Sequence, residues 1–311
     1  MALNSQFVLG IDGGGTHTVA LLAEAAGGAV VGRGRTGPSN IQAVGVEAAL
    51  RELDAAVTAA FADARLPRSK AAAACLGLAG VDLNEGLDII RGWADSVSLC
   101  DRITVANDAT LLFAAGTPDG WGLAIICGTG SIAFTLDRNG KDGRAGGWGY
   151  LLGDEGSAWL VALSGLRAAC RAADGAGPRT KLLDAFLAKL GTRDPRDFIP
   201  AVYRGEWDRA AIAGLAPLVV ECAEAGDAVA HKLVVKQVTE LARTAFTAVE
   251  SNGLPKLGLP VAVAGGLIVR SEFYRGLFVE ALRGFGLHPG AVTPVADPAI
   301  GAVAIARKLA S

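Results

Sequence analysis

Two glycine-rich turns, each set between two apolar strands, constrain this chain more than any other feature. The first lies in FVLGIDGGGTHTVAL at residues 7–21, and the second lies in LAIICGTGSIAFTL at residues 123–136. Thr16 and Ser131 occupy matching places, as the hydroxyl residues that close the two turns. Glycine is needed where the backbone adopts a positive φ or where another group approaches it closely. Because backbone N–H groups in such turns can hold phosphates, the repeat predicts a duplicated α/β unit around a nucleotide.

The segments around the two turns alternate between strand and helix patterns, which predicts largely parallel sheets covered by helices. The turn TPDG at 117–120 predicts two domains, at 1–117 and 118–296, and we expect the last helix, 297–311, to pack back on the first. In the second half we expect a glycine-rich stretch at 143–156, a single helix over 208–225 and a strand at 261–264.

Composition excludes several classes of protein. The net charge is −2 with both signs mixed, so neither a nucleic-acid surface nor a membrane surface is expected. Mean hydropathy is +0.38, yet no uncharged apolar stretch is long enough to span a membrane, and no signal peptide precedes the first strand. The five cysteines form no CxxC pair and are expected to be small buried residues in a reducing cytoplasm. We therefore expect a cytoplasmic protein.

Two carboxylates are candidates for chemistry. Asp108 follows a short apolar strand and precedes a helix, and ligands of α/β sheets gather at the carboxyl ends of strands. Such a carboxylate can accept a proton from an attacking hydroxyl, or it can simply be the N-cap of the helix. Asp12 lies in the first glycine turn, where a carboxylate beside bound phosphates commonly reaches Mg²⁺ through water.

The segment GGWGYLLGDEGSA at 146–158 is the most specific motif. An aromatic side chain between glycines, followed by two acids, suits a sugar; the structural alternative is a helix N-terminus whose acids complement its dipole. VAGGL at 263–267 is a strand that ends in two glycines and lets a planar ring approach the backbone. Asn40 alone is typical of a turn. His17, His231 and His288 share no motif and are expected at the surface or in packing.

Taken together, these motifs resemble the sugar kinases of the actin-like ATPase superfamily. The chain looks most like the BadF/BadG/BcrA/BcrD ATPase family, and within it like the N-acetylglucosamine kinase and glucosamine kinase branch. The resemblance rests on GIDGGGT, SN, ND, GTGS, GGWGYLLGDEGSA, LAPLVVECAEAGD, AGG and the final DPAIGA, which together span nearly the whole chain. It implies two ribonuclease H-like domains with a cleft between them, and a kinase that uses ATP and Mg²⁺.

The resemblance also implies a role for each matching residue. Asp108 would be the catalytic base and would also contact the sugar, and Asp12 would help to place the metal. The ATP-binding residues would be Gly13, Gly14, Gly15, Thr16, Gly128, Thr129, Gly130, Ala216, Gly265 and Gly266. The sugar-binding residues would be Asn40, Asp108, Ser131, Gly147, Trp148, Gly149 and Asp154.

Several alternatives stay open at the level of sequence. N-acetylglucosamine, phosphorylated at O6 to N-acetylglucosamine 6-phosphate, is the expected substrate. Glucosamine is the alternative, because Ile41 follows Asn40 where an aromatic residue is typical of N-acetylglucosamine kinases, and N-acetylmuramic acid is a third candidate. A more distant alternative is an ATPase that activates a radical dehydratase through an iron–sulfur cluster, but the cysteines supply no recognisable pair. A sugar-sensing repressor would need an N-terminal helix-turn-helix, for which the first strand leaves no room. A homodimer through the helices of 157–252 is a further expectation.

Overall fold

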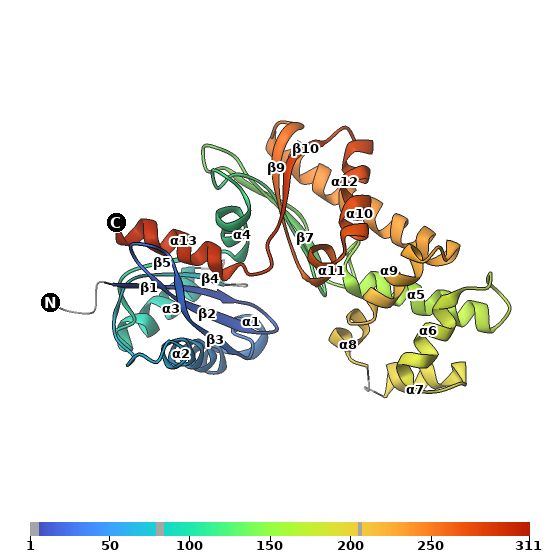
Figure 1. Ribbon diagram of the computed structural model, residues 1–311, viewed down its shortest axis with the longest axis horizontal. Helices are drawn as coiled ribbons and strands as arrows, with labels where there is room; N and C mark the ends of the chain where they lie inside the picture. The colour runs from blue at the N-terminus through green and yellow to red at the C-terminus, as the bar shows by residue number, and fades with distance from the viewer. Residues whose placement is uncertain (1–5, 79–83, 205–206) are drawn as a thin grey trace. The chain divides into compact units, whose positions relative to one another are not determined.

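The computed structural model describes residues 6–78, 84–204 and 207–311 (Figure 1). The chain divides into two compact units. The first comprises Met1–Gly120 together with Asp297–Ser311, and the second comprises Trp121–Ala296. The last helix therefore belongs with the first part of the chain.

The first unit is built on a five-stranded sheet. Its strands are β1 (Phe7–Gly13), β2 (Thr18–Glu24), β3 (Val30–Thr36), β4 (Ala71–Leu78) and β5 (Cys100–Ala106), in the order β3-β2-β1-β4-β5. The first three strands pair antiparallel, because short turns join them, whereas β4 is parallel to both β1 and β5. The carboxyl ends of β1, β4 and β5 consequently lie at one edge of the sheet.

Helices cover both faces of this sheet. On one face α2 (Val46–Asp63) and α3 (Asn84–Ser96) pack with α1 (Ile41–Val44) beside them; on the other lie α4 (Asp108–Gly116) and α13 (Ala299–Ala310). Alternation along β1 sorts the side chains, with Leu9 and Ile11 facing α2 and Val8 facing α13. Gly10 lies under α13, where a Cβ would stand 2.5 Å from the Val303 amide nitrogen. The last helix therefore packs directly on β1, as Figure 1 shows.

The second unit repeats the same sheet. Its strands are β6 (Gly122–Cys127), β7 (Ser131–Leu136), β8 (Asp142–Gly146), β9 (Leu257–Ala264) and β10 (His288–Pro294), in the order β10-β9-β6-β7-β8. When these strands are matched one by one to β1–β5, the order and every direction agree. The duplication expected from the two glycine turns is confirmed.

Two strands of the second sheet escaped the sequence analysis. The stretch at 143–156 is expected only as glycine-rich, without a strand, yet residues 142–146 form β8 against the free edge of β7. At the other edge β10 contains Pro289 and Pro294, which a central strand would not tolerate but an edge strand does. Both are edge strands formed by pairing with a neighbour rather than by their own β-propensity.

Most helices of the second unit lie between β8 and β9. They are α5 (Ala158–Ala173), α6 (Lys181–Leu190), a 3₁₀ turn (Pro195–Asp197), α7 (Phe198–Tyr203), α8 (Arg209–Ala213), α9 (Ala216–Glu224) and α10 (Ala228–Asn252), and after β9 come α11 (Gly266–Arg270) and α12 (Glu272–Gly284). The expectation of a single helix over 208–225 is wrong, because the helix is interrupted at Gly214 and Leu215. Pro217 lacks the N–H that a continuous helix would use there, so α9 begins just before it.

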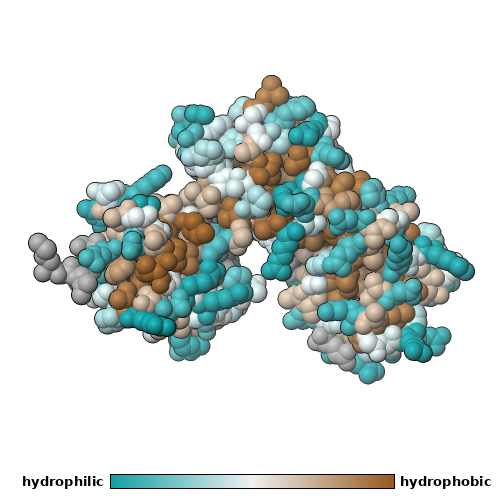
Figure 2. Space-filling view, in the orientation of Figure 1, coloured by the Kyte–Doolittle hydropathy of each residue, from teal (hydrophilic) through white to brown (hydrophobic). Residues whose placement is uncertain are grey.

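The surface mixes hydrophilic and hydrophobic residues over the face that Figure 2 displays. In the described ranges, none of the helices combines the length and the apolar character that crossing a bilayer requires. Only Cys75 and Cys127 are the buried cysteines that the sequence led us to expect. Cys100 and Cys222 are partly exposed and Cys170 is exposed, and all five are free thiols.

Candidate active site

Asp12 lies at the carboxyl end of β1, on the face of the sheet that α13 covers. It is opposite Val19 of β2 on one side and Gly77 of β4 on the other, and Gly77 is opposite Ala106 of β5. The side chain of Asp12 follows Val8 and Gly10 in the alternation and shares their face. The same face carries the N-terminal ends of α4 and α13, so the sheet brings Asp12 toward Asp108 and Asp297.

The three carboxylates influence one another. Burial, and then the negative charges of Asp108 and Asp297, together raise the pKa of Asp12 to about 7. Asp297 forms an ion pair with Arg33 of β3 and accepts a hydrogen bond from the Ala299 amide at 3.3 Å. A partly buried carboxylate beside two others is a place where a cation is electrostatically favoured. The sequence placed Asp297 only at the start of the last helix, because its partner Arg33 lies far away in the chain.

Asp108 is the first residue of α4 rather than its cap. The cap is Asn107, whose side chain accepts a hydrogen bond from the Ala109 amide at 2.9 Å. Asp108 Oδ1 accepts from the same amide at 2.9 Å. Asn107 is therefore the N-cap, and Asp108, the acidic residue of the first turn, accepts from the same amide. Its carboxylate lies where a strand ends and a helix begins, the usual place for a catalytic group in an α/β sheet.

The first glycine turn is open above its backbone. The Gly14 amide donates to the His17 carbonyl at 3.1 Å, and a Cβ at Gly15 would meet no atom within 4 Å. Gly13 is different, because a Cβ there would collide with Ser39 and Leu78. None of these glycines has a positive φ, so the expectation of left-handed backbone is wrong for this turn. Their use is to leave the backbone uncovered, and Thr16 is exposed beside them.

A second loop is fixed to this turn. The Ser39 amide donates to the Gly14 carbonyl at 3.1 Å, and the Thr18 hydroxyl donates to the Gly37 carbonyl at 2.8 Å and accepts from the Ser39 hydroxyl at 2.8 Å. Asn40 comes next and caps α1, with its side-chain oxygen accepting from the Gln42 and Ala43 amides at 2.9 and 3.3 Å. The loop therefore presents Asn40 next to the first glycine turn, with one side-chain oxygen already engaged.

In the second unit the matching turn is held by Asp154. The Gly128 amide donates to the Gly130 carbonyl at 2.9 Å, and the Ser131 amide donates to Asp154 Oδ1 at 3.2 Å. The Ser131 hydroxyl donates to the Glu155 carbonyl at 2.7 Å. Gly128 has open space where a Cβ would lie, but a Cβ at Gly130 would stand 2.8 Å from Asp154 Oδ2. Neither Gly128 nor Gly130 has a positive φ.

Asp154 is buried and fully engaged within its own unit. It is 3% exposed, adopts the left-handed region with φ +64°, and accepts from Arg209 Nη2 at 3.0 Å. Arg209, the first residue of α8, also lies over the Tyr150 ring at 4.7 Å. Arg209 thus joins the helical region to the GGWGYLLGDEGSA loop. Sequence reasoning missed it, because a single arginine after a turn carries no signal of its partner.

Trp148 stands out from the same loop. It is 67% exposed and lies between Gly147 and Gly149, whose φ values are +71° and +83°. The Gly147 amide donates to the Ser131 carbonyl at 3.1 Å, which ties the base of the loop to β7. Here the glycines are required by conformation. Arg144 lies over the indole, with its guanidinium carbon 5.8 Å from the ring centre, and most of the Trp148 side chain stays exposed.

The remaining expected ATP-binding residues differ in how far they are accessible. Gly265 has φ +102°, and a Cβ there would collide with the Cys127 carbonyl, so it packs against the second turn; Gly266 is exposed and opens α11. Thr129 lies partly exposed within that turn. Ala216, by contrast, is completely buried in the core of the second unit and offers no side-chain surface to a ligand.

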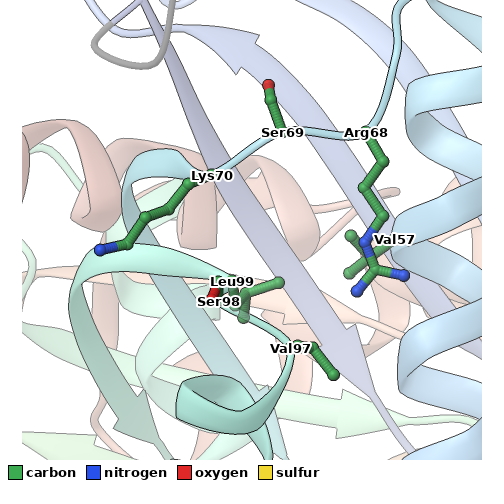
Figure 3. Close-up of a pocket in the computed structure, with 7 residues that line it drawn as sticks. All are labelled: Val57, Arg68, Ser69, Lys70, Val97, Ser98 and Leu99. Carbon is green, nitrogen blue, oxygen red and sulfur yellow. The ribbon is translucent and has the colours of Figure 1, made fainter.

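The cavity of Figure 3 belongs to the first unit, and none of the candidate site residues lines it. It has a volume of about 330 Å³ and is lined by Val57, Arg68, Ser69, Lys70, Val97, Ser98 and Leu99. Lys70 and Leu99 come directly before β4 and β5, so the cavity is at the amino ends of these strands, and Asp108 follows the carboxyl end of β5. Its two cations are already paired, Arg68 with Asp54 and Lys70 with Asp101, both at 2.7 Å.

Comparison with known proteins gives the arrangement a context. The model of the BadF/BadG/BcrA/BcrD ATPase family matches residues 9–306. An N-acetylmuramic acid/N-acetylglucosamine kinase of Clostridium acetobutylicum is 30% identical over 305 residues, which cover 97% of this chain and 98% of the relative. An N-acetyl-D-glucosamine kinase of Dictyostelium discoideum is 29% identical over 318 residues, covering 98% of each.

A solved structure agrees with these relatives. A Chromobacterium violaceum protein given the provisional name N-acetylglucosamine kinase superposes with a TM-score of 0.73 at 26% identity, covering 96% of this chain and 98% of that one. Together with the repeated sheet, this likeness confirms the expected fold class, two α/β units of the ribonuclease H-like, actin-like ATPase type.

Proposed function

Because this chain belongs to the BadF/BadG/BcrA/BcrD ATPase family, we propose that it transfers the γ-phosphoryl group of ATP to a hydroxyl of an N-acetylated amino sugar. The family match and the relatives named as sugar kinases identify it as an ATP-dependent sugar kinase. The observation that carries the site assignment is the meeting of Asp12, Asp108 and Asp297 at one end of the first sheet.

Asp108 is the proposed catalytic base. Phosphoryl transfer needs mainly alignment of the hydroxyl and neutralisation of charge on the phosphates. Asp108 would accept the proton of the attacking sugar hydroxyl. The oxygen of that hydroxyl would bond to the γ-phosphorus while the bond between the γ-phosphorus and the ADP oxygen breaks, so that ADP leaves. Its position at the start of α4, with Asn107 capping the helix in its place, supports this role.

The two glycine turns are the proposed phosphate holders. Gly14, Gly15 and Gly128 have room where a Cβ would lie, which supports close approach by a phosphate oxygen. Gly265 and Gly266 remain proposed neighbours of the adenosine. Ala216 is buried, so we propose that it does not touch the adenosine itself but supports neighbouring residues that do.

A magnesium ion fits the carboxylates of the first unit. The described residues contain no set of three His, Cys, Asp or Glu side chains arranged to enclose a metal by themselves. Mg²⁺ does not need one, since it is usually held by one or two carboxylates together with substrate phosphates and water. The raised pKa of Asp12 marks a carboxylate that a nearby cation would stabilise in its charged form. When bound, the ion would neutralise charge on the phosphates.

For the sugar we propose Asn40, Asp108, Ser131, Gly147, Trp148, Gly149 and Asp154 as the binding residues. The names of both relatives contain an N-acetylated sugar, which favours N-acetylglucosamine over free glucosamine and keeps N-acetylmuramic acid as a second substrate to test. The exposed indole of Trp148 offers the apolar face that a sugar ring packs on. Asp154 already accepts hydrogen bonds from the Ser131 amide and from Arg209. We therefore propose that it shapes the sugar site more than it contacts sugar hydroxyls.

The test is an ADP-release assay with N-acetylglucosamine, N-acetylmuramic acid and glucosamine, run on the native protein and on Asp108→Asn. We expect the native protein to favour an N-acetylated sugar in kcat/KM. Turnover of the variant should fall by ~10² or more, because an amide cannot accept the proton, while sugar binding persists. Near-normal turnover of folded Asp108→Asn would place the base elsewhere, and no ADP release with any of the sugars would reject the kinase assignment.

We also propose that the chain forms a homodimer through the helical part of the second unit. The supporting observation is α7, where Ile199 and Tyr203 are 61% and 84% exposed one helical turn apart. Sedimentation of the native protein and of Tyr203→Ser tests this, and a monomeric native protein would contradict it.

A further inference from the structure

The edge strand β3 brings a second, positively charged group to the first glycine turn. Arg35 is directly opposite Val19, and Val19 is directly opposite Asp12. Directly opposed residues share a face, and Val19 is buried against α13, so Arg35 lies on the α13 face in one row with Asp12. Two strand spacings, roughly 10 Å, separate their backbones, a span that a long arginine side chain can largely bridge.

Arg35 differs from Arg33, its neighbour on the same face of β3. Arg33 is paired with Asp297, whereas Arg35 is exposed and has no ion pair among the residues that the structure describes. A cation without a carboxylate partner, beside an uncovered glycine turn, is available to an anion. Arg33 therefore stabilises the fold, and Arg35 is the cation that remains for a ligand.

His17 lies beside Arg35 and has an unused polar atom. It is the residue before β2, two positions from Val19, and so is the diagonal neighbour of Arg35 on the same face. Its Nδ1 is buried and has no hydrogen-bond partner within the described part of the chain. Burial, with the nearby charges of Arg35 and Arg33, lowers the pKa of His17, which keeps the ring neutral near pH 7. A neutral ring can donate one hydrogen bond from Nδ1.

The charges of this corner explain why an anionic ligand needs such groups. Asp12, Asp108 and Asp297 would repel a triphosphate, and Arg33 offsets only Asp297. A magnesium ion at Asp12 would offset one side of the ligand. The opposite side, toward β3, is where Arg35 and His17 lie.

We propose that Arg35 and His17 form an anion-binding pair that holds terminal phosphate oxygens of the nucleotide on the β3 side of the first glycine turn. The proposal rests on the proposed function, since it assumes that the nucleotide phosphates occupy this turn. It makes the pair a determinant of selectivity for ATP over AMP, with no part in sugar binding.

The experiment measures equilibrium binding of ATP, AMP and N-acetylglucosamine by calorimetry to the native protein, Arg35→Gln, Arg35→Lys and His17→Phe. Arg35→Gln should raise the Kd for ATP by about tenfold, as expected for loss of a charge-assisted hydrogen bond, and leave AMP and sugar affinity nearly unchanged. Arg35→Lys should recover part of the loss. His17→Phe keeps the ring volume but removes both nitrogens, and should raise the Kd for ATP several-fold.

Arg51→Gln is the matched control. It removes the same charge from an exposed position on α2, which covers the opposite face of the sheet, and should leave ATP affinity unchanged. An unchanged Kd for ATP in Arg35→Gln would overturn the proposal, and so would an equal loss of affinity for ATP, AMP and sugar. If Arg35→Gln raises the Kd for ATP and His17→Phe does not, His17 is not part of the anion-binding pair. If the native protein binds ATP and phosphorylates sugar, and Arg35→Gln has the same Kd for ATP, this inference fails and the proposed function stands. If the native protein binds no ATP, the proposed function itself fails.

Discussion

Replacing Asp12 by asparagine should stabilise the protein when neither metal nor nucleotide is present. The pKa of Asp12 rises from 3.8 to about 7 in the folded protein, chiefly through burial and then through Asp108 and Asp297. Between these two values the folded state holds a proton that the unfolded chain has lost. The free energy of unfolding therefore falls as pH rises from about 4 to about 7, and this loss persists at higher pH.

The size of the effect follows from the shift. Three pKa units at 1.36 kcal/mol each give an upper limit of about 4 kcal/mol at pH 8. Asparagine has nearly the same shape and no charge, so Asp12→Asn avoids this loss. For a unit of this size, 1 kcal/mol moves Tm by roughly 2–4 °C, so a difference of several degrees is expected at pH 8 and almost none at pH 4.

Thermal unfolding in a chelator, from pH 4 to 8, measures the difference between the native protein and Asp12→Asn. Asp88→Asn serves as control, because it removes a carboxylate that is 78% exposed from the same unit. Adding Mg²⁺ with ATP should reverse the ranking at pH 8, since only the native carboxylate gains a cation. A Tm difference that does not grow with pH, or a variant less stable than the native protein at pH 8, would refute this electrostatic account.

Three further substitutions separate ligand approach from folding. Gly15→Ala points its Cβ into open space, so we expect an unchanged Tm and a raised KM for ATP; a lowered Tm would contradict this. Gly130→Ala brings its Cβ to 2.8 Å from Asp154 Oδ2, so it should lower Tm and raise the KM for sugar as well as for ATP, and a selective effect on ATP would argue against the contact. Arg209→Ala leaves the buried Asp154 without its cation and should cost about 1–2 kcal/mol in urea unfolding, less than a fully buried pair because Arg209 is 41% exposed; Arg209→Lys should restore part of it, and equal losses in both variants would count against the ion pair.

The elements that follow from local patterns could be predicted from the sequence. The hairpins β1–β2 and β6–β7 follow from apolar strands joined by glycine turns. The edge strands β8 and β10 could not be predicted, because their residues favour turns and only the partner strand supplies the hydrogen bonds. Pro217 was a readable signal against a continuous helix over 208–225.

The candidate site was predictable as motifs and only in part as contacts. Asp12 and Asp108 each carry a local signal, a glycine turn and a strand end. Their coupling to Asp297 depends on α13 returning to the first sheet, which no local pattern contains. Of the two reasons given for the glycines of both turns, positive φ is absent from Gly13, Gly14, Gly15, Gly128 and Gly130, whereas Gly15 and Gly128 leave their backbone open to close approach.

The return of α13 also has a consequence for biosynthesis. Val8, Val19, Ala73 and Leu111 lie under α13, a helix that is synthesised only after the whole second unit. At ~5–20 residues per second, translation of the intervening second unit delays that helix by roughly ten seconds or more. Until then one face of the first sheet lacks its cover, so the nascent chain carries an exposed apolar surface while its central part is already free to fold. Messages truncated before codon 297 should yield a product that chaperones retain.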